Sequence, residues 1–89
     1  MDCFVYVLGT SAKRRHLTYV GWTNDITRRL KQHNAGKGAK YTRGRRPVVL
    51  VYQEAAIDRA AAQRREAEIK RMRLEIKRQL VESQRGARK

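Results

Sequence analysis

Two short apolar segments, each with a tyrosine near its centre, constrain the fold of this chain more than any other feature. The first segment runs from Cys3 to Leu8 around Tyr6, and the second runs from Leu17 to Trp22 around Tyr19. Continuous apolar runs that are rich in β-branched and aromatic residues predict strands. The loop between them is too short for a parallel crossover, which needs about a dozen residues or more. The two segments therefore predict an antiparallel hairpin.

The faces of this hairpin follow from strand alternation. Tyr19 and Gly21 fall on one face of the second segment, and Val20 and Trp22 fall on the other. A third apolar run extends from Val48 to Tyr52. Because this run is almost wholly apolar, it is expected to be a central strand or a strand covered on both faces.

Two helices are predicted outside the strands. Thr23-Asn24-Asp25 supplies the capping signals of the first helix, which is expected to end near Asn34, before Gly36. The second helix is expected over residues 57–83, which are rich in Ala, Arg, Glu, Lys and Leu. A chain of 89 residues has room for one domain with a modest core. Residues 1–83 are expected to form that domain, and residues 84–89 a basic tail that frays.

The charge of the chain indicates the class of its partner. Lys and Arg number 22 against 8 Asp and Glu, for a net charge of +14, which is typical of nucleic-acid binding. A protein of a membrane surface would carry a similar excess. The apolar stretches reach only about six residues, however, far below the roughly 20 that span a bilayer, and the N-terminus does not resemble a signal peptide. A soluble, cytoplasmic protein is therefore expected, without a membrane partner.

Cysteine and histidine are too sparse for several kinds of site. Cys3 is the single cysteine, so an intramolecular disulfide is excluded, and its place in a strand predicts a small core residue. Together with His16 and His33 it offers too few and too scattered ligands for a zinc site.

The most concentrated basic segment lies between Gly36 and Pro47. It interleaves basic residues with one aromatic residue, namely Lys37, Lys40, Tyr41, Arg43, Arg45 and Arg46. One interpretation is a solvated, flexible connection. The other is a nucleic-acid contact, with phosphates on the cations and a base or sugar against the ring.

Helical projection of the first helix separates its two adjacent arginines. Ile26, Leu30 and His33 follow the spacing of a buried stripe. Arg29 lies about 60° from the centre of this stripe, whereas Arg28 points nearly opposite. We therefore expect Arg29 at the edge of the core, where its guanidinium can present a fixed charge to a phosphate.

The same projection of the later helix selects one acid. Its stripe comprises Ala62, Ile69, Met72, Ile76 and Leu80. Glu66 lies about 60° from the centre, and the other acids of the helix lie about 100° or more away. Two interpretations of Glu66 stay open. It forms a salt bridge with a nearby arginine (Arg59, Arg64, Arg65 or Arg73), or it holds Mg²⁺ together with substrate phosphate and water.

These motifs in this order resemble the GIY-YIG nuclease superfamily. The similarity rests on Tyr19-Val20-Gly21 after a tyrosine-bearing strand, Arg28-Arg29-Leu30 with His33-Asn34, the loop from Gly36 to Thr42, and Arg64-Arg65-Glu66. It covers about residues 3–75 and is closest to the small stand-alone bacterial members.

The resemblance implies an α+β fold with a three-stranded antiparallel sheet flanked by helices, and a single divalent-metal site. Tyr6 and Tyr19 match the motif tyrosines, Arg29 matches the motif arginine, and Glu66 matches the metal-binding glutamate. His33 and Asn34 match positions often occupied in the small members, and we expect them to contribute to nucleic-acid binding.

Two positions depart from the family pattern. Phe4-Val5-Tyr6 stands in place of Gly-Ile-Tyr, which matters little for a strand interior. Trp22 stands where some relatives have a lysine, so a proton relay through lysine is absent and Thr23 or a water would replace it.

The expected function is that of a metal-dependent endonuclease that hydrolyses phosphodiester bonds. Glu66 would hold Mg²⁺ or Mn²⁺, Arg29 would stabilise the transition state, and Tyr19, or Tyr6 through a water, would deprotonate the attacking water. DNA is expected rather than RNA, with recognition of structure rather than sequence, a role in DNA repair or processing, and specificity supplied in part by a protein partner. A monomer or weak dimer is expected. The alternative is a non-catalytic nucleic-acid-binding module on the same fold.

Overall fold

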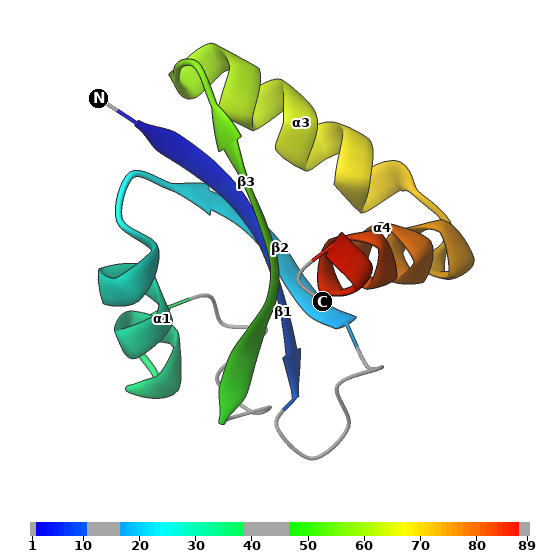
Figure 1. The fold of residues 1–89 in the computed structure, drawn as a ribbon. Helices are drawn as coiled ribbons and strands as arrows, with labels where there is room; N and C mark the ends of the chain where they lie inside the picture. The colour runs from blue at the N-terminus through cyan, green and yellow to red at the C-terminus, as the bar shows by residue number, and fades with distance from the viewer. Residues whose placement is uncertain (1, 11–16, 39–46, 88–89) are drawn as a thin grey trace.

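Three strands and three helices make up the computed structural model, which describes residues 2–10, 17–38 and 47–87 (Figure 1). In chain order they are β1 (Cys3–Thr10), β2 (Leu17–Thr23), α1 (Ile26–Asn34), β3 (Val48–Ala56), α3 (Arg59–Arg71) and α4 (Leu74–Ala87). The strands form one antiparallel sheet in the order β2-β1-β3. Helix α1 covers one face of the sheet, and α3 and α4 cover the other (Figure 1). The predicted α+β class and the antiparallel hairpin are confirmed.

The central strand of this sheet is β1. It pairs with β2 on one side, where Tyr6 lies opposite Gly21, and with β3 on the other, where Val7 lies opposite Tyr52. Of the two alternatives predicted for the third strand, a central position is wrong, because β3 lies at the edge of the sheet. Coverage on both faces is confirmed, since α1 contacts β3 on one face and α3 and α4 contact it on the other. Burial in β3 is complete only at Val48 and Tyr52, whereas β1 is buried from Val5 to Gly9. Apolar composition alone therefore did not show that β1, rather than β3, is the central strand.

Alternation along the strands divides the core between the two faces of the sheet. On the face covered by α3 and α4, the buried residues are Cys3, Val5, Val7, Val20, Tyr52, Ala62, Ile69 and Val81. On the face covered by α1, Tyr6, Leu8 and Val48 are buried, with Tyr19, Ile26 and Leu30 packed against them. The predicted faces of β2 are confirmed, and Cys3 is a core residue as expected. The two motif tyrosines thus lie under α1.

Helix α1 begins and ends close to the predicted positions. The Asp25 side chain accepts a hydrogen bond from the Arg28 backbone N–H at 3.1 Å and so caps the first turn. At the other end, Asn34 exchanges two hydrogen bonds with the backbone of Val48, at 2.7 and 3.0 Å. These contacts attach the end of α1 to the first residue of β3.

The predicted single helix over residues 57–83 is wrong, because the chain breaks into α3 and α4. Met72 has extended backbone angles (φ −65°, ψ 145°), and the Arg73 carbonyl accepts hydrogen bonds from the first residues of α4. The change of direction brings Val81 into the core and leaves Ile76 44% exposed, although a continuous stripe would have buried Ile76. Helix α4 also runs to Ala87, beyond the expected end near residue 83.

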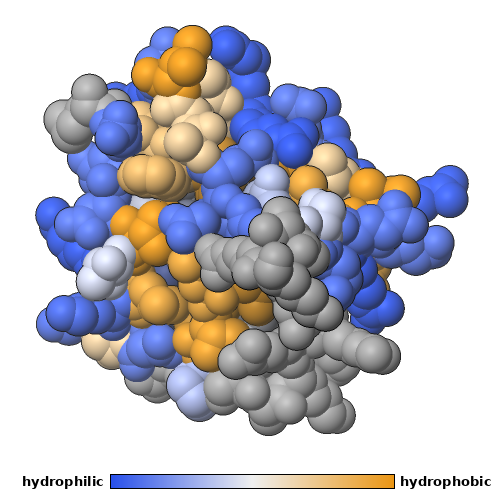
Figure 2. Space-filling view, viewed as in Figure 1, coloured by the Kyte–Doolittle hydropathy of each residue, from blue (hydrophilic) through white to orange (hydrophobic). Residues whose placement is uncertain are grey.

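Hydrophilic residues dominate the visible surface, as the charge of the chain requires (Figure 2). Hydrophobic residues gather at the top of this view, over the junction of β3 and α3, and again between α1 and β3 (Figure 2). None of the described helices is both long and apolar enough to cross a membrane.

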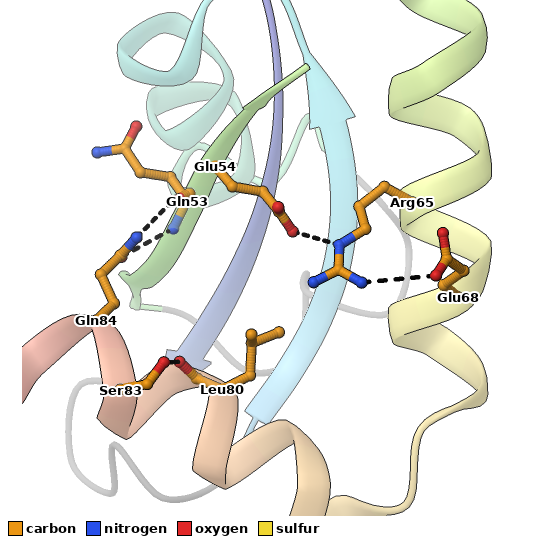
Figure 3. A network of polar contacts seen from close by, with 7 residues as sticks. All are labelled: Gln53, Glu54, Arg65, Glu68, Leu80, Ser83 and Gln84. Atoms are coloured by element: carbon orange, nitrogen blue, oxygen red, sulfur yellow. Dashed lines mark hydrogen bonds and ion pairs between the residues drawn. The ribbon is translucent and has the colours of Figure 1, made fainter.

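Polar contacts attach both C-terminal helices to β3 (Figure 3). From α3, Arg65 Nε donates to Glu54 Oε1 at 2.6 Å, and Arg65 also pairs with Glu68 at 3.6 Å. From α4, the Gln84 side chain hydrogen-bonds the backbone N–H and C=O of Gln53. Arg65 is thus committed to fixing α3 against the sheet.

Candidate active site

Two tyrosine rings and one histidine ring lie together on the α1 face of the sheet. The ring centroids of Tyr6 and Tyr19 are 6.2 Å apart, and the centroid of His33 lies 4.9 Å from that of Tyr19. Gly21 makes this approach possible, because a Cβ atom there would lie 2.6 Å from Tyr6 Oη and 2.8 Å from Tyr19 Cε2. The glycine of the second motif is therefore required by the space that the two tyrosines occupy.

The imidazole of His33 lies behind this pair and is completely buried. Its Nε2 is 2.9 Å from the Tyr6 hydroxyl. Burial lowers the pKa of His33, and the charge of Arg29 lowers it further. The neutral ring present at pH 7 can accept a hydrogen bond at Nε2 and thus orient the tyrosine.

Two properties were predicted for His33, namely burial in the core and contact with nucleic acid. The burial predicted from helical periodicity is confirmed. A fully buried ring does not fit the direct nucleic-acid contact that we expected from the family resemblance. Gly38 completes the enclosure, since a side chain there would overlap the ring and the Cα atom of His33. The sequence signalled the burial of His33 but gave no indication of its contact with Tyr6.

The Tyr6 hydroxyl stays protonated near neutral pH. Burial raises the pKa of Tyr6 to about 12, and the neighbouring Arg29 only partly opposes this effect. Tyr6 is only 2% exposed, whereas Tyr19 is half-buried. Tyr6 is therefore suited to hold its neighbours in position, and Tyr19 is the motif tyrosine that solvent can reach.

Arg29 extends from α1 toward both tyrosines, at the edge of the core as predicted. Hydrogen bonding with Tyr6 raises the pKa of Arg29, and its interaction with Tyr19 acts in the same direction. Its Nη1 also donates to Gln32 Oε1 at 3.2 Å. Its Nε is buried and has no hydrogen-bond partner within the described part of the chain. Arg28, in contrast, is exposed.

Two cavities meet at Arg29. One of about 600 Å³ extends from Arg29 to the start of α3, and one of about 210 Å³ lies over the start of α1. The guanidinium thus lies beside the buried tyrosines and next to space that a ligand can enter.

Glu66 lies on α3 and is half-buried, with 22% of its side chain exposed. Burial is the main reason that the pKa of Tyr6 is raised, and the negative charge of Glu66 makes the smallest contribution. The interpretation of Glu66 as the partner of a nearby arginine is not supported within the described residues, because Glu66 Oε1 pairs with Lys70 Nζ, one turn along α3, at 3.6 Å. The adjacent Arg65 is held by Glu54 instead.

The carboxylate of Glu66 fits a metal ion whose other ligands are mostly water and phosphate. Among the described residues, no three His, Cys, Asp or Glu side chains gather to form a protein cage for an ion. One partly exposed carboxylate is nevertheless a usual protein contribution to Mg²⁺ when substrate phosphates complete the coordination. Glu66 is such a carboxylate, so it could hold Mg²⁺ or Mn²⁺ in that way.

The residues expected to bind nucleic acid fall into two groups. Lys37 is exposed just beyond α1, and the Asn34 side chain is hydrogen-bonded to β3. Lys40, Tyr41, Arg43, Arg45 and Arg46 lie outside the described residues.

Comparison with known proteins decides the family. Residues 2–79 match the GIY-YIG catalytic domain. The chain belongs to the GIY-YIG family. It is also 49% identical to a UPF0213 protein of Haloquadratum walsbyi over 89% of this chain and 85% of that protein. A UPF0213 protein of Natronomonas pharaonis is 44% identical over 96% of both chains.

A solved structure of a related protein has a similar fold. The solution NMR structure of a UPF0213 protein from Bacillus halodurans superimposes with a TM-score of 0.55 and 43% sequence identity, over 92% of this chain and 84% of that one. This GIY-YIG protein is thus a member of the small UPF0213 group, whose relatives include bacterial and archaeal proteins.

Proposed function

We propose that this GIY-YIG protein is a divalent-metal-dependent endonuclease that hydrolyses phosphodiester bonds in nucleic acid. DNA is its preferred substrate over RNA, and it recognises structure rather than sequence. The observation that carries the proposal is the cluster formed by both motif tyrosines and His33 beside Arg29, at the edge of the core. Family membership and the net charge of +14 support a nucleic-acid substrate.

Arg29 would bind the scissile phosphate. A guanidinium is permanently charged and presents its donors in a fixed fork that matches phosphate oxygens. Contacts with Tyr6, Tyr19 and Gln32 hold this fork before substrate arrives. Donors that are already oriented stabilise charge as it develops without reorganising during the reaction.

Tyr19 would orient the attacking water and accept its proton. The proton would pass to the phenolate form of Tyr19, in which the hydroxyl has already lost its own proton, and the permanent charge of Arg29 lies beside it. Tyr6 is unsuited to the same task because its pKa is raised to about 12. Its hydroxyl instead links His33 to Arg29 and keeps the arginine in place.

Glu66 would hold Mg²⁺ or Mn²⁺ at the phosphate. A divalent ion, when bound, neutralises charge on the phosphate and on the leaving oxygen. Lys70 would release the carboxylate for this role, since a half-exposed ion pair within one helix is worth only about 0.3–0.5 kcal/mol.

The proposal is tested by incubating labelled single-stranded, duplex and branched DNA, and RNA, with the protein and Mg²⁺ or Mn²⁺. Arg29→Ala and Glu66→Ala should each lower cleavage by about 10²-fold or more, as expected for loss of a transition-state contact. The matched controls are the exposed neighbours Arg28→Ala and Glu68→Ala, which should cleave like the wild type. Cleavage that survives both site substitutions would refute the assigned site. Binding without cleavage under any condition would favour the non-catalytic module.

A further inference from the structure

We propose that the 600 Å³ cavity beside Arg29 is a nucleoside-binding subsite, which holds a base near the phosphate that Arg29 contacts. The inference rests on the proposed function, because that function supplies the nucleic-acid strand. It adds a site that the mechanism above does not use, formed by Trp22, Ile57 and Arg59.

The cavity is lined by residues from elements on both faces of the sheet. Trp22 comes from the end of β2, Arg29 from α1, and Ile57 and Arg59 from the junction of β3 with α3. Its volume falls within the roughly 300–1,000 Å³ that small-molecule sites occupy. A group that enters this cavity lies beside Arg29, which also contacts the tyrosines.

The walls of the cavity combine apolar surface with charged groups. Arg29 and Arg59 are positive, and the one carboxylate among the described lining residues, Asp58, accepts a hydrogen bond from a backbone N–H as the cap of α3. Ile57 is 89% exposed, so most of a large aliphatic side chain is left in water beside the cavity. Hydrophobic residues are visible over this junction of β3 and α3 in Figure 2. The guanidinium of Arg59 lies over the ring of Trp22, with its Cζ atom 5.7 Å from the ring centroid. A base can contact the apolar groups while the attached phosphates lie near the two arginines.

The spacing along α3 relates this cavity to the proposed metal ligand. Arg59 and Glu66 are seven residues apart, which is about two helical turns, so they share one side of α3. The rise between them is about 10 Å, or roughly three steps of a stacked strand at about 3.4 Å each. The base in the cavity would therefore belong to a nucleotide within about three positions of the cleaved bond.

Trp22 provides a direct measurement because it is the single tryptophan of the chain. The experiment follows its fluorescence as the protein binds a short single-stranded oligodeoxynucleotide in metal-free buffer. A second series carries one abasic nucleotide, moved through the strand. Binding should change the emission, and one abasic position should weaken affinity by about five-fold or more, since base stacking is worth roughly 1–3 kcal/mol.

Substitutions then separate the cavity from general charge attraction. Ile57→Ser and Arg59→Ala should each weaken binding by about five-fold and remove the response to the abasic position. The matched controls lie on α4, where Ile76→Ser changes another exposed apolar side chain and Arg78→Ala another exposed cation. Both controls should keep the abasic response. Folding is not at risk in Ile57→Ser, because the side chain is almost fully exposed.

The two proposals fail in distinguishable ways. Unchanged Trp22 emission at saturation, equal affinity for all abasic strands, or wild-type binding by Ile57→Ser would each overturn the subsite, whether or not the protein cleaves. Loss of the abasic response in Ile57→Ser, together with an absence of cleavage in any metal, would support the subsite and refute the nuclease. No binding to any oligonucleotide would overturn both.

Discussion

Replacing Tyr6 by Phe removes one oxygen atom from the centre of the proposed site. The ring and its packing in β1 are retained, so the core loses almost no apolar contact. The change deletes the 2.9 Å hydrogen bond to His33 Nε2 and the interaction of the hydroxyl with Arg29. It therefore isolates the polar contribution of the buried tyrosine to folding and to catalysis.

The size of the effect on stability follows from burial. His33 is completely buried, so its Nε2 cannot replace the lost partner with bulk water. A buried polar group left without a partner costs about 1–3 kcal/mol. Domains of this size are stable by roughly 5–13 kcal/mol, so Tyr6→Phe should remove a large part of the free energy of unfolding. The melting temperature should fall by about 4–8 °C for each kcal/mol lost.

Urea unfolding followed by circular dichroism measures this difference, and single-turnover cleavage measures the second effect. With its link to His33 gone, Arg29 should be less well oriented, so cleavage should fall while affinity for uncleaved DNA changes less. Tyr52→Phe is the matched control, because Tyr52 is also buried but lies on the opposite face beside Glu54 and Arg65. It should lower stability without lowering cleavage.

A double-mutant cycle supplies the decisive result. Contacting residues couple by about 0.5–3 kcal/mol, so Tyr6→Phe and His33→Gln should not be additive in their effects on stability. Additive effects, or a Tyr6→Phe protein as stable as the wild type, would refute the idea that this hydroxyl organises the site.

Three further predictions concern the residues around this pair. Gly21→Ala should cost about 1–3 kcal/mol of unfolding free energy, measured in urea, because the new methyl group enters space filled by the tyrosine rings. Asn34→Ala removes two hydrogen bonds to β3 and should cost about 1–3 kcal/mol in the same assay. Because the pKa of His33 is lowered by folding, the unfolded chain binds the extra proton as pH falls below about 6.5. The contribution of neutral His33 to the free energy of unfolding should therefore be complete above that pH and should decrease as the pH falls below it. In thermal melts, His33→Gln should make stability less dependent on pH in this range.

Much of the fold could be predicted from local sequence patterns. Strand alternation separated Tyr19 and Gly21 from Val20 and Trp22, and helical periodicity buried His33 and set Arg29 at the edge of the core. These properties depend on geometry within one element, which the period of the element fixes. The same periodicity placed Glu66 at a half-buried position on α3, where the structure has it.

Contacts between elements could not be predicted in the same way. The break at Met72 contains neither Gly nor Pro, and it forms because a redirected α4 buries Val81 and lets Gln84 reach β3. The partner of Glu66 is a lysine because the competing Arg65 finds Glu54 on a neighbouring strand. Both outcomes depend on tertiary packing, which local propensity does not encode.

The two buried residues of the site, Tyr6 and His33, link folding to the proposed chemistry. Burial lowers the pKa of His33 and raises the pKa of Tyr6, so both rings are neutral at pH 7 and share one hydrogen bond beside Arg29. Neither buried residue needs to touch substrate for its loss to disturb the reaction. Substitutions of Tyr6 or His33 are therefore expected to lower stability and cleavage together, whereas substitutions of Glu66 should lower cleavage alone, because its half-exposed pair with Lys70 contributes little to the fold.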